Sequence, residues 1–173
     1  DEVKISDLFS AMLISSANDS ALALSHYVEK KQGKPFIDLM NQESKNLGLQ
    51  DTRFSNPNGF DSDTNYSSAE DLKLLFDQLD LKNVFQTTSR SSSYTMTGSL
   101  KKNYHVTATN DLIKQYSDLY AVKTGYTNEA QGSMINRLKF NDYEYLLIVL
   151  GSPDREGDTL KLREIIKTNN LGG

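Results

Sequence analysis

Residues 119–150 read LYAVKTGYTNEAQGSMINRLKFNDYEYLLIVL, and most of the expected architecture follows from this stretch. Segments 131–139 and 143–150 predict two strands, joined by a tight turn at Asn141 and Asp142. Segment 119–124 is a further, short strand candidate. Because segment 143–150 is apolar on both alternating faces, we expect it to be a central strand that is covered on both sides.

The first half of the chain predicts helices that pack beside this sheet. Ser6 could cap a first helix, and a cluster at residues 15–19 favours a break after it. Asn18 or Asp19 could cap a second helix, whose segment 21–24 is apolar on most faces and is therefore expected to be buried. The apolar positions of the first helix recur at helical spacing, at Ile5, Leu8, Phe9, Met12 and Leu13.

Further helices are expected at residues 35–47, with Gly48 as the stop, and after Ser67 and Glu70, which have capping-box spacing. Segment 91–106 alternates loosely and predicts a hairpin with its tip near residues 101–103. The apolar face of the helix after residue 67 contains Leu72, Leu75, Phe76 and Leu79, and that of a closing helix contains Leu162, Ile165 and Ile166. The fold class is thus α+β, with a helical cluster packed beside an antiparallel sheet that needs cover on both faces.

Composition excludes several classes of function. The formal net charge is −4 and the basic residues are scattered among acids, so we expect no nucleic-acid partner. Cysteine is absent, which excludes disulfides and thiolate catalysis. His26 and His105 are expected to be structural, and their spacing predicts no metal site; we expect no cofactor. No apolar run approaches the roughly 18 residues of a membrane-spanning helix.

Two triplets can carry chemistry: Ser16-Ala17-Asn18 at the break between two helices, and Lys123-Thr124-Gly125 on a strand. Each has a simpler interpretation, since Ser16 and Asn18 could be helix caps and Lys123 could be a solvated lysine at a strand end. Class A β-lactamases and penicillin-binding proteins combine such triplets with a Ser-x-x-Lys motif. The order of the triplets and their placement on these elements agree with that superfamily.

The chain resembles the D-alanyl-D-alanine carboxypeptidases, which are low-molecular-mass penicillin-binding proteins with a β-lactamase/transpeptidase-like fold. The similar segments are spread in family order over nearly the whole chain: LISSANDSA at 13–21, FSNPNGF at 54–60, NYSSAEDL at 65–72, TNDLI at 109–113 and VKTGYT at 122–127. The resemblance implies a serine hydrolase that trims peptidoglycan stem peptides through an acyl-enzyme and is acylated by β-lactams.

The same resemblance implies a role for each site residue. Ser16 would pass a proton toward the leaving amine, and Asn18 would hold the substrate amide. Lys123 would supply a positive field, and with Thr124 it would bind the terminal carboxylate. Gly125 would let the peptide approach the strand closely, and the backbone N–H of Tyr126 would form half of an oxyanion hole.

The chain departs from the family in one respect. Its single Ser-x-x-Lys is Ser99 to Lys102, between the two triplets and not ahead of them. We therefore expect residues 1–173 to be the C-terminal two-thirds of a single catalytic domain, incomplete at the N-terminus, inactive alone and able to bind its missing N-terminal part.

The implied location is extracytoplasmic, at the bacterial cell surface or in the periplasm, with membrane association only through a segment outside this chain. Two alternatives stay open. One is a non-catalytic module that binds peptidoglycan or β-lactams. The other is a serine β-lactamase, against which stand Ala17 in the middle triplet and the absence of a Glu-x-x-Leu-Asn loop.

Overall fold

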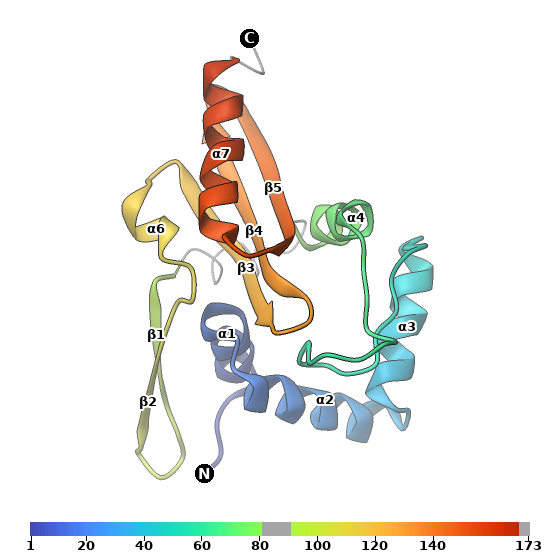
Figure 1. Ribbon diagram of the computed structural model, residues 1–173. Helices are drawn as coiled ribbons and strands as arrows, with labels where there is room; N and C mark the ends of the chain where they lie inside the picture. Colours follow the sequence, from blue (N-terminus) through green and yellow to red (C-terminus); the bar gives the residue numbers. More distant parts are fainter. Residues whose placement is uncertain (81–90, 170–173) are drawn as a thin grey trace.

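The computed structural model describes residues 1–80 and 91–169, in which helices lie around an antiparallel sheet (Figure 1). The elements in chain order are α1 (Ile5–Ser15), α2 (Asn18–Gln32), α3 (Phe36–Asn46), α4 (Ala69–Asp80), β1 (Ser93–Thr97), β2 (Asn103–Thr107), α6 (Leu112–Gln115), β3 (Leu119–Thr127), β4 (Gln131–Phe140), β5 (Tyr143–Ser152) and α7 (Arg155–Thr168). The α+β class expected from the sequence is therefore confirmed.

The main sheet has the strand order β3-β4-β5, and both pairings are antiparallel. The predicted turn between β4 and β5 is confirmed: Phe140 pairs with Tyr143, and Asn141 adopts a left-handed conformation with φ 54°. The predicted central position of segment 143–150 is wrong within the described residues, because β5 pairs only with β4 and forms an edge. The predicted cover on both sides of this strand is confirmed, since α7 and α4 both contact β5. An apolar run indicates burial, but it does not say which strand lies beside it.

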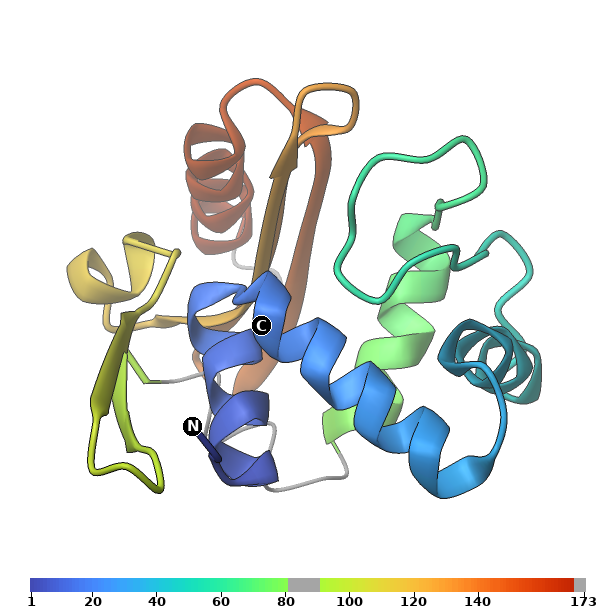
Figure 2. The same ribbon diagram turned by 90° about the horizontal axis from the view of Figure 1, so that it is seen from below.

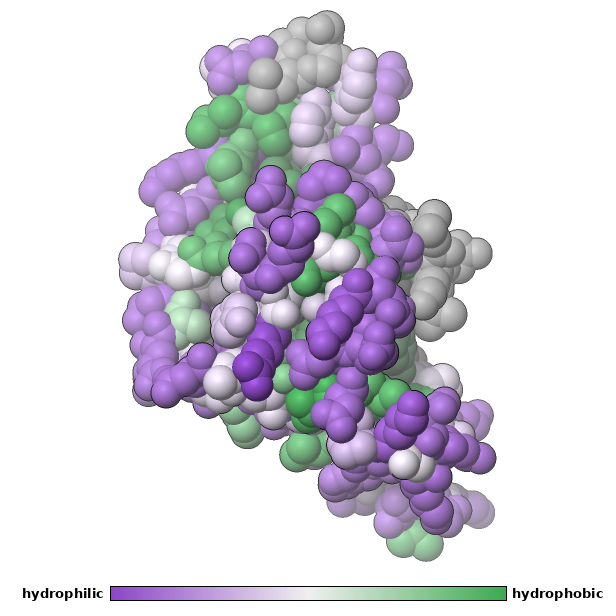
Figure 3. Space-filling view, turned by 90° about the vertical axis from the view of Figure 1, so that its right-hand side faces the viewer, coloured by the Kyte–Doolittle hydropathy of each residue, from purple (hydrophilic) through white to green (hydrophobic). Residues whose placement is uncertain are grey.

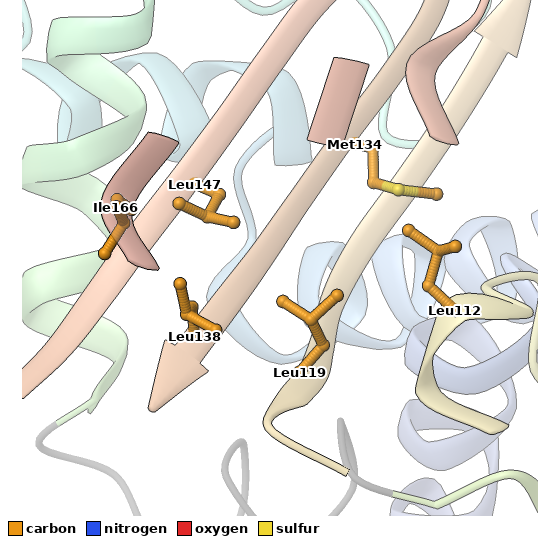
Figure 4. Close-up of a cluster of buried hydrophobic side chains, with 6 residues drawn as sticks. All are labelled: Leu112, Leu119, Met134, Leu138, Leu147 and Ile166. Atoms are coloured by element: carbon orange, nitrogen blue, oxygen red, sulfur yellow. The ribbon is translucent and has the colours of Figure 1, made fainter. Parts of the chain in front are cut away.

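Helices cover both faces of this sheet, as the apolar strands require. Figure 2 shows the sheet between α7 on one side and α4 on the other. On the second side, Phe76 of α4 packs with Ile135 of β4 and with Leu13 of α1. The core on the first side, shown in Figure 4, consists of Leu112, Leu119, Met134, Leu138, Leu147 and Ile166.

The predicted hairpin is present as β1 and β2, and it packs against α1. Tyr94 of β1 donates a hydrogen bond from its hydroxyl to Asp7 Oδ1 at 2.8 Å. As a result, the buried face of α1 consists of Asp7, Ala11 and Ile14. The apolar face predicted for α1 is not the buried one: Ile5 is 42% exposed, and the other members of that face are only half-buried.

The second helix also differs from its prediction. Its buried residues are Ser20, Ala21 and Ser25, whereas Leu22 is 40% exposed, so α2 is a surface helix rather than a buried one. Apolar residues on most faces of a helix do not bury it unless other elements surround it. None of the helices in residues 1–80 and 91–169 is long and apolar enough to cross a membrane.

Local hydrogen bonds decide where the helices end. The ends were predicted from the sequence only to within a residue or two. Ser6 lies inside α1, and α1 begins without a side-chain cap. Ser68 rather than Ser67 caps α4, since Ser68 Oγ accepts from the Asp71 N–H at 3.2 Å. In α7, Ile166 is buried but Ile165 is 51% exposed, so the predicted face of that helix is only partly correct.

Candidate functional site

Ser16 lies at the sharp turn between α1 and α2. It has φ 56° and ψ 38°, a left-handed conformation that costs a residue other than glycine about 1 kcal/mol. Ser16 is the C-cap residue of α1, and its backbone N–H donates to the Ala11 carbonyl, so the interpretation of Ser16 as a cap is confirmed for its backbone. The N-cap of α2 is Ala17 and makes no side-chain bond, so the interpretation of Asn18 as a cap is wrong. Both Ser16 and Asn18 line a cleft.

Lys123 reaches this turn from β3. Its ammonium donates hydrogen bonds to Ser16 Oγ and, at 2.5 Å, to the Thr124 carbonyl oxygen. The side chain is half-buried, so the interpretation of Lys123 as a solvated lysine is also wrong. Burial, together with the positive charge of Arg155, lowers the pKa of Lys123 to about 8. A lysine with this pKa is partly neutral near pH 7.

The two triplets thus meet in one open cleft of about 680 Å³ between the helices and the β3 edge of the sheet. All six site residues predicted from the sequence line this cleft: Ser16, Asn18, Lys123, Thr124, Gly125 and Tyr126. The convergence of Ser16 and Lys123 joins residues that are 107 positions apart in the chain.

The other candidates do not contribute to the cleft. Ser99, from the only Ser-x-x-Lys, lies beyond β1 at the hairpin tip, where its hydroxyl donates to Asp1 Oδ1 at 2.8 Å. His105 lies across the hairpin from Thr95, whose hydroxyl is 2.8 Å from the ring Nδ1. His26 is exposed on α2. Within the described residues, no three His, Cys, Asp or Glu side chains are close enough to hold a metal ion.

Thr109 is a cleft residue that the sequence alone did not single out. Its backbone N–H donates to the Ile14 carbonyl at 3.3 Å, and its hydroxyl lies 2.5 Å from the Thr124 hydroxyl. Thr109 therefore connects the end of α1 to the Lys-Thr-Gly strand. The only signal for it was its place at the start of the TNDLI segment.

Arg155, at the start of α7, is the second residue that was missed. Its guanidinium donates from Nη1 to the Gly125 carbonyl at 2.7 Å and from Nε to Glu156 at 2.9 Å. Because the contact with Gly125 depends on how α7 packs against β4 and β5, no sequence pattern predicts it.

The chemistry available in the cleft is that of anion binding and proton relay. Lys123 and Arg155 supply positive charge, and hydroxyls and an amide lie around them. The exposed edge of β3 can pair with an extended peptide. The Ser16 hydroxyl, in contact with a lysine of lowered pKa, can move a proton.

A family model described as D-alanyl-D-alanine carboxypeptidase matches residues 1–154. D-alanyl-D-alanine carboxypeptidase DacF of Bacillus subtilis is 30% identical over 153 residues, which are 88% of this chain and 39% of the relative. The D-alanyl-D-alanine carboxypeptidase of Streptomyces sp. strain K15 is 30% identical over 175 residues, covering 94% of this chain and 60% of the relative.

Solved structures with the same fold include the Streptomyces K15 DD-transpeptidase, with a TM-score of 0.83, 27% identity, and coverage of 92% of this chain and 66% of that one. Penicillin-binding protein D2 of Listeria monocytogenes in its cefotaxime-bound form gives a TM-score of 0.78 at 31% identity, with coverage of 94% and 66%. These likenesses confirm the transpeptidase-like fold expected from the sequence. The chain spans only 39% and 60% of the length of the two curated relatives.

Proposed function

Since the chain belongs to the D-alanyl-D-alanine carboxypeptidase family, we propose that it forms part of a serine enzyme that removes the terminal D-Ala from peptidoglycan stem peptides. The observation that carries this proposal is the contact of the Lys123 ammonium with Ser16 Oγ, beside a strand edge that is open to a peptide. The reaction is acyl transfer from the peptide to a serine and then to water.

We propose that residues 1–173 are the C-terminal two-thirds of a single catalytic domain. The nucleophile and its lysine belong to a Ser-x-x-Lys in a preceding segment, because the only such motif here lies at the hairpin tip, outside the cleft. The greater length of the matched relatives supports this assignment. This chain alone is then inactive.

In this mechanism a serine oxygen attacks the carbonyl carbon between the two D-Ala residues, and the amide bond to the terminal D-Ala breaks. Ser16 passes a proton to the leaving amine, and the charge of Lys123 keeps the neighbouring lysine base neutral. Asn18 holds the substrate amide. Water then cleaves the ester and restores the serine.

The strand residues hold the substrate. The ammonium of Lys123 and the hydroxyl of Thr124 bind the terminal carboxylate, a charge-assisted contact. A methyl group on Gly125 would have only Ser133 Cβ near it, at 3.9 Å, so the packing of the sheet does not require glycine at this position. The absence of a side chain instead allows the peptide to approach the strand closely. The Tyr126 N–H contributes half of the oxyanion hole.

The missing N-terminal part is a proposed partner of this chain. The apolar face of α1 at Leu8, Phe9 and Met12 is only half-buried, and β5 is an edge strand within the described residues. Figure 3 shows apolar patches that interrupt a mainly hydrophilic surface on the side of the molecule it displays. An apolar segment that packs there would complete the domain.

The remaining partners and the location follow from the substrate. Penicillin-binding protein D2 of Listeria has structures with cefotaxime and with ampicillin bound, and we propose that β-lactams acylate the present enzyme too. Because peptidoglycan lies outside the cytoplasm, the enzyme acts at the cell surface or in the periplasm. Membrane attachment would use a segment outside this chain.

A labelled penicillin tests the proposal. The complete gene product is expected to form an adduct that survives denaturation and to release D-Ala from a D-Ala-D-Ala peptide, whereas residues 1–173 alone form no adduct. Ser16→Ala should slow acylation at least about tenfold. Ser15→Ala is the matched control, because the Ser15 hydroxyl donates to the Ala11 carbonyl at 2.9 Å and not into the site.

The same experiment separates the alternatives. Reversible peptide binding by the complete protein without an adduct would indicate a binding module and not an enzyme. The position of Ser99 outside the cleft supports this alternative. Rapid release of hydrolysed penicillin would indicate a β-lactamase.

A further inference from the structure

A buried polar pair lies in the otherwise apolar core between the sheet and α7. Asn136 of β4 is 0% exposed, and Asn110, just before α6, is 2% exposed. The Asn110 amide donates from Nδ2 to Asn136 Oδ1 at 2.7 Å, and Asn110 Oδ1 accepts from the Leu112 N–H at 3.0 Å. Met134 and Leu138, two positions before and after Asn136, belong to the apolar cluster of Figure 4. Because side chains alternate along a strand, Asn136 faces the same core.

Packing alone does not account for an amide at position 136. Within the described residues, Asn136 Nδ2 is buried and has no hydrogen-bond partner. A buried donor that is left unbonded destabilises the folded state, and an apolar side chain in this core would avoid that loss. The bond from Asn110 to Asn136 is therefore the feature that calls for an explanation.

β3 contains one extra residue directly opposite Asn136. Ala121 of β3 pairs with Asn136. Two residues later Lys123 pairs with Ile135, so the register shifts by one at this bulge. Such a shift moves a side chain to the other face of the sheet, and bulges often aim a side chain in this way beside an active site. Lys123 therefore faces the same side as Ile135, where α1 packs, and not the core that contains Asn136.

Thr109 and Asn110 bridge this bulge. The Thr109 hydroxyl lies 2.5 Å from the hydroxyl of Thr124, which follows the bulge on β3. The neighbouring Asn110 binds Asn136, which pairs with β3 just before the bulge. The Thr109 N–H also donates to the Ile14 carbonyl at 3.3 Å, near the end of α1. This segment thus holds β3 on both sides of the extra residue and fixes it relative to α1.

We infer that Asn136 is a positioning residue: through Asn110 it holds the bulged register of β3, which turns Lys123 toward the cleft. This inference rests on the proposed function, because the aim of Lys123 matters only if that ammonium acts on a substrate. Asn136 is fully buried and does not line the cleft, so it acts through other residues. Without the bond from Asn110, Lys123 and Thr124 should move away from the productive geometry, and a misplacement of about 1 Å can lower a rate about a hundredfold.

Acylation kinetics of the complete gene product test this inference. The readouts are the second-order rate constant for a labelled penicillin and kcat/KM for release of D-Ala from Nα-acetyl-Lys-D-Ala-D-Ala. Asn136→Val removes the acceptor with a side chain that is close in size and suits a strand, and both rates should fall at least about tenfold. Asn136→Asp keeps an oxygen for the Asn110 amide, and burial keeps its carboxyl neutral, so this variant should recover most of the lost rate.

Leu138→Ala is the matched control, since Leu138 is equally buried on the same strand and in the same core. It should lower the melting temperature at least as much as Asn136→Val does and leave both rates within about twofold of the parent. Because the two amides act as a unit, the Asn110→Ala, Asn136→Val double variant should be no slower than Asn110→Ala alone.

Parent-like rates in a folded Asn136→Val variant, or an equal loss of rate in Leu138→Ala, would overturn the positioning role and leave the proposed function intact. If Asn136→Val does not fold, Asn136→Ala takes its place in the same comparison. A parent protein that neither forms a penicillin adduct nor releases D-Ala would instead contradict the proposed function, and the positioning role with it.

Discussion

Lys123 and Arg155 place two positive charges beside the same strand, and only one of them can lose its proton at moderate pH. Burial and the charge of Arg155 lower the pKa of Lys123 to about 8, whereas a guanidinium stays charged. The Lys123 ammonium nevertheless has two acceptors, Ser16 Oγ and the Thr124 carbonyl. The charge of Lys123, and with it the proposed affinity of the site for a carboxylate, should therefore depend on one proton.

The affinity for a peptide should depend on the protonation state of Lys123. Below about pH 8 Lys123 is charged and favours a carboxylate, so affinity for Nα-acetyl-Lys-D-Ala-D-Ala should fall about tenfold as the pH rises from about 7 to about 10. The same peptide with an amidated C-terminus should show no such fall, and titration calorimetry measures both. Equal pH dependence for the acid and the amide would remove Lys123 from carboxylate binding.

The lowered pKa also predicts the direction of a change in stability. Because Lys123 titrates at about 8 in the folded chain and near 10.5 unfolded, the unfolded state binds more protons between these values. The free energy of unfolding should then rise with pH across this window, by at most about 3 kcal/mol from this group. Urea unfolding of the parent and of Lys123→Met at about pH 7.5 and about pH 10 isolates the effect, which the variant should lack.

Thr109 orients the hydroxyl that is proposed to bind the substrate. Only one of the paired hydroxyls of Thr109 and Thr124 can donate in their bond, so Thr109 influences where the Thr124 proton points. Thr109→Val should weaken binding of the carboxylate peptide about fivefold, the value of one neutral hydrogen bond, with little effect on the amide peptide. Thr109→Ser should restore binding, and Thr107→Val on the exposed end of β2 is the control. Equal losses for both peptides would indicate a merely structural role.

Among the helices and strands, alternation and turn residues were enough to locate the strands, because these signals are local. They could not place β5 at an edge, nor show that α1 buries Asp7, Ala11 and Ile14 rather than its more apolar face. Those outcomes depend on which elements pack together. The same distinction holds for the site residues. The two triplets could be predicted from the sequence, whereas Thr109 and Arg155 could not, because they contact the site from distant segments of the chain.

Replacement by alanine should affect Gly132 and Gly125 of the sheet differently, the first in stability and the second in peptide binding. At Gly132 an added Cβ would lie 2.6 Å from the Ser152 carbonyl and 3.1 Å from Arg155 Cδ. Gly132→Ala should therefore destabilise the fold by about 1–3 kcal/mol and displace Arg155 from Gly125. At Gly125 the nearest atom is 3.9 Å away, so Gly125→Ala should change stability by less than about 1 kcal/mol while weakening peptide binding. Thermal unfolding and peptide titration measure the two effects, and similar melting temperatures for both variants would contradict this account.

In the molecule as a whole, the cleft lies between separate parts of the chain, among them the turn after α1, the loop between α3 and α4, and the edge strand β3; Thr109 and Arg155 complete its lining. The opposite edge, β5, and the half-buried face of α1 have no such closure within residues 1–80 and 91–169. Leu74 and Leu150 remain 42% and 40% exposed. Leu8, Phe9, Leu74 and Leu150 lie outside the cleft, whereas Met12 of the same α1 face lines it, so the open apolar surface adjoins the cleft at Met12.

That open surface predicts how residues 1–173 behave in isolation. Unpaired strand edges and apolar faces associate in water, so the chain should bind a hydrophobic dye such as ANS and sediment as a mixture of monomer and larger species. Addition of the N-terminal part of the gene product, made separately, should suppress the dye signal, restore a single species and raise the melting temperature in proportion to the logarithm of its concentration. A sharp monomer without dye binding would mean that the surface is already satisfied within the chain, and the two-part domain would then have no physical basis.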